Sequence, residues 1–200
     1  MSRRSLALAA GAGLLFVPGV AQAHLMTTGL GPVYDGVSHF FLTFEDLIPA
    51  VAMALLAGLN GTAAGRRVLF ALPISWLVGG LAGFAWRMPH LPPGLTAVSF
   101  LALGGLAALD RRLGPTAVTA LACALGLLHG ALNGAGIAEV GREATGLLGI
   151  SGAIFVLTAL VSAGIVSLRQ PWTRVAARVA GSWIAAIGLL LLGWSIRGAS

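Results

Sequence analysis

The sequence predicts an all-α, polytopic membrane protein with six transmembrane helices that follow a cleaved N-terminal signal peptide. Of its 200 residues, 58% are hydrophobic and only 9% are charged, whereas about 25% are charged in an ordinary soluble domain. The mean hydropathy is +0.94, which excludes a disordered chain. The 12 basic and 6 acidic side chains cannot cover a water-soluble surface, and the 29 glycines suit close helix packing in a membrane.

Residues 1–23 are predicted to be a signal peptide, and residues 24–200 a single transmembrane bundle domain. A pair of arginines, a short apolar run and the small-residue motif Ala21-Gln22-Ala23 follow one another, as in bacterial export signals. The apolar run is shorter than the roughly 20 residues that span a bilayer, so cleavage is favoured over an uncleaved first helix. Cleavage would make His24 the mature N-terminus, whose amine and imidazole together suit a metal ion.

Six apolar stretches follow, each separated from the next by loop-forming residues. Because the hydrocarbon core offers the backbone no hydrogen-bond partner, each stretch is expected to be a helix. The third stretch is shorter than the roughly 20 residues that a bilayer needs. The six predicted spans cover residues 37–59, 68–86, 95–109, 116–132, 147–168 and 175–196.

The orientation of these spans follows from the arginines, since the sequence contains no lysine. With the mature N-terminus outside, seven arginines lie on the inner side: Arg66, Arg67, Arg111, Arg112, Arg169, Arg174 and Arg178. Only Arg87, Arg142 and Arg197 lie on the outer side. The positive-inside rule therefore predicts a multi-pass protein of the bacterial inner membrane with both mature termini outside. Because the arginines are scattered, the net charge of +6 does not indicate nucleic-acid binding.

The polar residues gather on the outer side of this arrangement. All four histidines and five of the six acids lie outside or in the outer halves of spans: His24, His39, His90, His129, Asp35, Glu45, Asp46, Glu139 and Glu143. Imidazoles and carboxylates are ligands for divalent metal cations. Ionisable residues inside a membrane span are costly and usually functional. This distribution predicts a cation site that is reached from outside.

Two acids and a histidine make the first span the most informative one. If this helix is continuous and begins early enough to include Asp35, then Asp35, His39 and Asp46 lie within about 40° of one another. Glu45 points to a different face. Pro49 is expected to kink this helix, because proline cannot donate a hydrogen bond to the carbonyl of Glu45.

The fourth span carries a second polar pair beside a row of glycines. His129 and Asn133 are four residues apart and share a helix face. Buried polar groups need partners, so the first and fourth spans are expected to touch, which would bring His39, Glu45 or Asp46 close to His129 and Asn133. Close packing of another helix beside the imidazole is expected from the glycines that recur every four residues: Gly126, Gly130 and Gly134.

The polar stretch of the first span resembles a signature of the HupE/UreJ family of nickel/cobalt permeases. That signature is a histidine, five residues, and then Asp-His. His39 occupies the first position, Glu45 replaces the aspartate, and Asp46 stands where the second histidine would be. A carboxylate in place of an imidazole favours harder, oxygen-loving cations.

The fourth span resembles the second signature of the same family, which reads Phe-His-Gly, one residue, a small aliphatic, one residue, Gly, one residue, Glu. His129, Gly130 and Gly134 match it, whereas Gly136 stands in the place of the glutamate. The resemblance implies about six transmembrane helices, a cleaved signal and transport of nickel or cobalt. It points to His39, Glu45, Asp46 and His129 as metal ligands. The outer placement of His24, Asp35 and Asn133, and not the resemblance, makes them possible accessory residues.

The predicted function is therefore a secondary permease that takes up a divalent transition-metal cation, with the lipid bilayer and that cation as its partners. No GxxxxGK[ST] loop is present, so transport would be passive or coupled to an ion gradient rather than driven by ATP within this chain. No enzymatic activity and no resident cofactor are predicted.

Two alternatives remain open. One is a non-transporting membrane subunit that binds metal or a partner protein. The other is a rhomboid-like intramembrane serine protease, suggested by Gly149-Ile150-Ser151-Gly152. No histidine follows Ser151 in the sequence, so the base that would activate such a serine is missing from the expected position.

Overall fold

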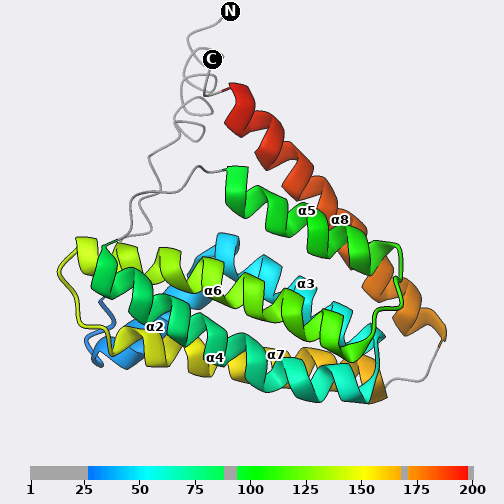
Figure 1. Ribbon diagram of the computed structural model, residues 1–200, viewed down its shortest axis with the longest axis horizontal. Helices are drawn as coiled ribbons and strands as arrows, with labels where there is room; N and C mark the ends of the chain where they lie inside the picture. Colours follow the sequence, from blue (N-terminus) through cyan, green and yellow to red (C-terminus); the bar gives the residue numbers. More distant parts are fainter. Residues whose placement is uncertain (1–26, 88–93, 168–170, 198–200) are drawn as a thin grey trace, which may run out of the picture.

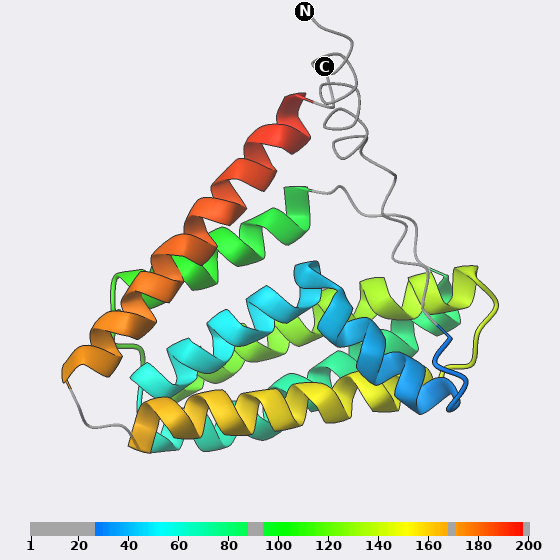
Figure 2. The same cartoon turned by 180° about the vertical axis from the view of Figure 1, so that it is seen from behind.

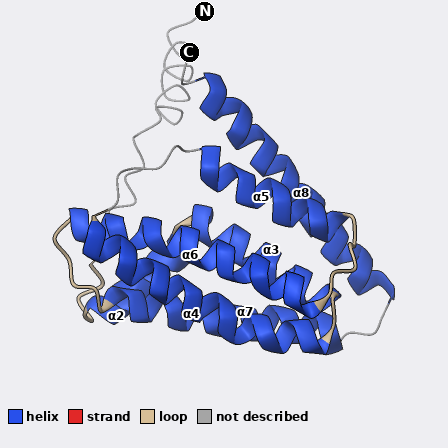
Figure 3. Ribbon diagram, in the orientation of Figure 1, coloured by secondary structure: helices blue, strands red, loops and turns tan. Residues whose placement is uncertain are grey.

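The computed structural model describes residues 27–87, 94–167 and 171–197, which form helices and no strand (Figures 1 and 3). The all-α class is confirmed for this part of the chain. The signal peptide, His24 and His90 lie outside the described residues. The helices are α2 (Pro32–Leu42), α3 (Phe44–Leu59), α4 (Thr62–Trp86), α5 (Gly94–Ala108), α6 (Pro115–Glu139), α7 (Gly146–Ser167) and α8 (Pro171–Arg197).

Most of these helices are long and apolar enough to cross a bilayer. Helices α4, α6, α7 and α8 each satisfy this condition alone, and α2 with α3 satisfies it as a bent pair. Helix α5 is apolar but only 15 residues long. The described chain therefore has four or five candidate spans and is a multi-pass membrane protein. The count of six stays a prediction, because it depends on a crossing by the short helix α5.

The first predicted span is broken, so the expectation of one continuous helix was wrong. Helices α2 and α3 meet at an angle of 76°. The break lies at Thr43, whose backbone is extended and whose carbonyl accepts the N–H groups of Asp46 and Leu47. The break lies six residues before Pro49, and α3 continues through Pro49 although this residue cannot donate to the carbonyl of Glu45.

The bend also corrects the expected helix face. Asp35 and His39 lie on α2, whereas Asp46 lies on α3, and the two helix axes diverge at Thr43. Angular positions that hold for one continuous helix do not carry across such a break. The three side chains therefore do not form one polar stripe, and each must find its partners separately.

Helix α3 lies at the centre of the bundle and contacts every other described helix. Almost all of its residues from Asp46 onward are buried. Figure 2 shows α3 on the side of the other helices that faces the α5–α8 pair. A polar side chain in this buried stretch of α3 is thus surrounded by protein rather than lipid.

Helices α4 and α6 are the most closely packed pair, and they run parallel. A side chain at Gly126, Gly130 or Gly134 would collide with α4 near Leu72, Trp76 and Gly80, respectively. Gly79 and Gly83 of α4 lie equally close to the backbone of α6. Because glycine has no side chain, the two backbones come together over about two helical turns. This packing places His129 directly beside Trp76.

Helices α5 and α8 form a second, antiparallel pair that leans away from the other helices (Figure 2). Gly104 of α5 packs against Gly181 and Ala185 of α8. At one end the pair is joined by two hydrogen bonds of 2.7 Å between Arg174 and the carboxylate of Asp110. Asp110, the single acid predicted to lie on the inner side, therefore has a structural partner.

Candidate functional site

Asp46 is a buried carboxylate in the first turn of the central helix α3. Its relative exposure is 3%, whereas the adjacent Glu45 is exposed. The break at Thr43 sets this arrangement, because it makes residue 46 one of the first residues of a new helix. The positive end of the helix dipole stabilises a negative charge at that position.

Asp46 is held by two residues of α6. Nδ1 of His129 lies 2.9 Å from Oδ1 of Asp46, and the amide of Asn133 donates a 2.8 Å hydrogen bond to Oδ2. His129 is completely buried. A carboxylate only accepts hydrogen bonds, so an ionised Asp46 accepts this bond from a protonated Nδ1. The structure thus brings Asp46, His129 and Asn133 into one network.

Two further residues complete this network. The hydroxyl oxygen of Ser99, on α5, lies 3.0 Å from Nε2 of His129. The indole Nε1 of Trp76, on α4, donates a 3.1 Å hydrogen bond to the amide oxygen of Asn133. The Trp76 and His129 rings are 5.4 Å apart. Sequence reasoning missed both residues. A lone serine and a tryptophan in apolar spans give no signal until helix packing brings them to His129.

The Ser99 hydroxyl gives the network two possible proton arrangements. Its oxygen lies within hydrogen-bond distance of the carbonyl of Thr96, at 2.7 Å, and of His129. A hydroxyl has one proton, so it donates either to the carbonyl or to the ring. In the first arrangement the Ser99 oxygen accepts a hydrogen bond from Nε2 of His129, and in the second the hydroxyl donates to Nε2.

Not all predicted ligands join Asp46 and His129. Glu45 is exposed and has no polar partner in the described part of the chain. His39 is half-buried on α2, and its Nδ1 lies 3.3 Å from the hydroxyl of Thr43. Within the described residues, no three His, Cys, Asp or Glu side chains come together as a metal site. The shared site consequently has one imidazole and one carboxylate at its centre.

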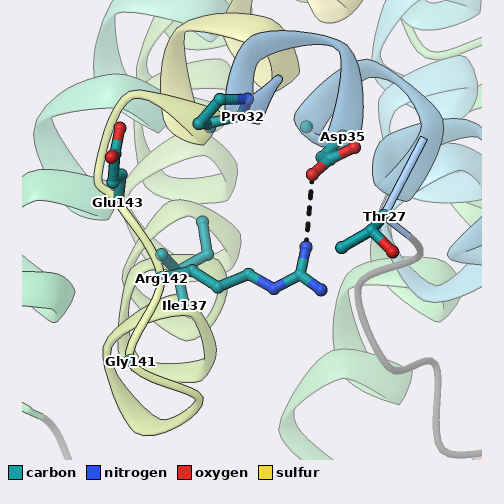
Figure 4. A pocket seen from close by; sticks show the side chains of 9 residues that line it. Thr27, Pro32, Asp35, Ile137, Gly141, Arg142 and Glu143 are labelled. Atoms are coloured by element: carbon teal, nitrogen blue, oxygen red, sulfur yellow. Dashed lines mark hydrogen bonds and ion pairs between the residues drawn. The ribbon is translucent and has the colours of Figure 1, made fainter. Parts of the chain in front are cut away.

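A cavity of about 270 Å³ lies beyond this network, at the end of the bundle where α2 begins and α6 ends (Figure 4). Ile137 contributes to its lining and lies one turn beyond Asn133 on α6, a rise of about 6 Å. The cavity is therefore close to the buried network along α6. Its lining also includes Thr27, Pro32, Asp35, Gly36, Gly141, Arg142, Glu143 and Gly146.

Asp35 links three segments at this cavity. One carboxylate oxygen accepts hydrogen bonds from the backbone N–H and the hydroxyl of Thr28, at 2.6 and 2.7 Å. The other oxygen lies 3.4 Å from Nη1 of Arg142, as Figure 4 shows. This guanidinium partly neutralises the carboxylate that faces the cavity. Asp35 therefore belongs to the mouth of the bundle rather than to the buried network.

Ser151, the serine of the protease alternative, lies within α7. Its hydroxyl has no hydrogen-bond partner among the described side chains and backbone groups. No base is therefore placed on this serine in the part of the chain that the structure describes, and the geometry does not support an activated nucleophile.

Comparison with known proteins identifies the family. The family model for HupE / UreJ proteins matches residues 12–191. No curated protein and no solved structure matches the chain. The match covers nearly the whole sequence, including the stretch that ends at Asp46 and the stretch that begins at His129. The chain therefore belongs to the HupE / UreJ family.

Proposed function

We propose that this protein is a secondary permease for a divalent transition-metal cation, nickel or cobalt, and that Asp46 and His129 are its central ligands. The family is associated with nickel and cobalt transport. The observation that carries the proposal is the direct contact between the two signature stretches, which meet as Asp46 and His129 inside an apolar bundle. Buried ionisable pairs of this kind are costly in a membrane protein and usually serve its function.

The chemistry of the pair suits such a cation. Imidazole nitrogen binds nickel and cobalt well, and a carboxylate supplies negative charge and a harder donor. A cation bound at Nδ1 of His129 must displace the proton that this nitrogen shares with Asp46, so that a proton leaves as the metal binds. Asn133 and Ser99 orient the two ligands from outside the pair.

The small number of protein ligands is consistent with transport. A permeating ion must be bound strongly enough to enter and weakly enough to leave. A site with two central protein ligands keeps most coordination positions for water or for transient donors such as His39 and Glu45. A tight storage or structural site would instead close its coordination shell with protein side chains.

Uptake by cells that express only this chain tests the proposal. We expect radioactive nickel or cobalt to accumulate above the level of cells that carry an empty vector. If the protein is present in the membrane and accumulation equals that of the vector, the permease proposal is wrong. Metal binding by the purified protein would then favour the non-transporting subunit.

The proposed orientation has six crossings and both mature termini outside. The parallel α4–α6 pair and the antiparallel α5–α8 pair have the relative directions that six alternating crossings require. We expect cytoplasmic reporter activity for fusions after Leu113 and Gln170, because most arginines lie at that side. A fusion after Glu143 should report a periplasmic location. Periplasmic activity after both Leu113 and Gln170 would overturn this topology.

The cavity at Asp35 is the proposed outer mouth of the cation path. Replacing Arg142 by glutamine removes a positive charge that faces Asp35 and repels the cation. We expect the KM for metal uptake to fall about two- to fivefold, the effect of up to about 1 kcal/mol from one partly exposed charge. Arg87→Gln, which changes a second predicted outer arginine that does not line this cavity, is the control. An unchanged KM for Arg142→Gln, or an equal fall for both variants, contradicts this role.

A further inference from the structure

A second cavity of about 310 Å³ lies between α4 and α7, far from the residues of the proposed metal path. It is a groove at the end of the bundle where α4 begins and α7 ends. Small side chains keep it open, and Gly65 and Ser162 approach each other within it. Its lining consists of Thr62, Gly65, Arg66 and Leu69 from α4, and Ala159, Ser162, Ala163 and Val166 from α7.

The groove combines a charged end with apolar walls. Arg66 is exposed and has no hydrogen-bond or ion-pair partner in the described part of the chain. Its neighbour Arg67, in contrast, donates to the hydroxyl of Thr116. The first turn of α4 has no side-chain cap, so its N–H groups add to the positive potential beside Arg66.

The direction of the groove matches that of a lipid in the bilayer. Thr62 and Arg66 lie at the end of α4, and Leu69 lies seven residues after Thr62, about 10 Å deeper along the helix. On α7, Val166 lies near the helix end, and Ala159 lies seven residues before it, about 10 Å deeper along the helix. The polar groups therefore lie at headgroup depth, and the apolar walls extend toward the hydrocarbon.

We propose that this groove binds an anionic phospholipid. The phosphate contacts the Arg66 guanidinium and the Thr62 hydroxyl, and an acyl chain lies between the small residues of α7 and Leu69. A guanidinium binds phosphate through paired hydrogen bonds. In the orientation proposed above, this end of the bundle lies in the cytoplasmic leaflet, where a basic residue near the surface attracts anionic lipids. This inference is independent of metal transport.

Lipid-dependent thermal unfolding of the purified full-length protein in detergent tests the inference. We expect added phosphatidylglycerol to raise the unfolding temperature, and phosphatidylcholine or inorganic phosphate to leave it unchanged. Arg66→Gln should raise the half-saturating phosphatidylglycerol concentration about fivefold, the effect of one basic residue at a lipid surface. Ala163→Phe, which fills the groove and leaves Arg66 in place, should weaken the effect to a similar extent.

Arg112→Gln is the matched control, because Arg112 is exposed and belongs to the same predicted inner side but not to this groove. It should respond to phosphatidylglycerol like the unmodified protein. Equal losses in Arg112→Gln and Arg66→Gln would show a general charge effect and overturn the site. An unchanged response of Arg66→Gln or Ala163→Phe to phosphatidylglycerol would also overturn the site. An equal response to phosphatidylcholine would exclude recognition of the charge, and an equal response to inorganic phosphate would identify a free anion instead.

Discussion

Replacing Asp46 or His129 by alanine is expected to abolish metal uptake. Each substitution removes one of the two central ligands and leaves its partner buried without its hydrogen bond. Loss of a single residue that holds or orients a metal ligand costs about 10- to 100-fold in metal affinity or activity, so loss of a ligand should cost at least as much. Initial rates of nickel or cobalt uptake, divided by the amount of protein in the membrane, measure the effect.

Glu45→Ala is the matched control for Asp46→Ala, because it removes a carboxylate from the next position of the same helix. Glu45 is exposed and unpartnered within the described residues, so uptake should fall by much less. Because Asp46→Ala can also destabilise the bundle, Asp46→Asn should be measured beside it. Asparagine keeps the size of the side chain and removes its charge. Normal uptake by both Asp46→Asn and His129→Ala would exclude the pair from the metal path.

The same variants also show whether the two residues act as one site. Side chains in direct contact do not contribute independently, whereas distant ones do. The double variant Asp46→Ala/His129→Ala should therefore transport no worse than the poorer single variant. If the loss of uptake in the double variant equals the product of the two single losses, Asp46 and His129 are two separate positions on the path.

Replacing Gly130 by leucine is expected to prevent normal assembly of the bundle. A side chain at this position collides with the backbone of α4 at Trp76 and Gly80, which cannot move aside as a flexible side chain does. Overpacking of this kind costs about 1–3 kcal/mol or more. We expect a large loss of monodisperse protein in gel filtration and a lower unfolding temperature.

Gly136→Leu tests whether the loss depends on position in α6. No atom lies within 4 Å of a Cβ at Gly136, so leucine meets open space there. This variant should be obtained in nearly the normal amount. Equal losses at Gly130 and Gly136 would show that the backbone of α6, and not its contact with α4, requires glycine.

Much of the fold follows from patterns that act locally. Each apolar stretch after residue 59 corresponds to a helix, because a backbone in hydrocarbon has no alternative to internal hydrogen bonds. Most ends agree closely, but α4 begins at Thr62 instead of residue 68 and α6 ends at Glu139 instead of residue 132. The four-residue glycine spacing likewise indicates close packing, since it places every small residue on one helix face. The break at Thr43 was not predicted. A helix can end at an ordinary residue when tertiary contacts compensate for the lost hydrogen bonds, and Thr43 carries no proline or glycine signal.

The sequence by itself determined that this protein is a helical membrane protein of the HupE / UreJ type, and that His129 and the acids of the first span need polar partners. The cost of polar groups in an apolar bundle dictates that need whatever the packing. Only the tertiary structure decided which acid meets the imidazole. Asp46 and His129 are 83 residues apart in the chain, and the break at Thr43 directs Asp46 inward while Glu45 stays exposed. The partners therefore depend on helix directions and packing, which no local pattern specifies.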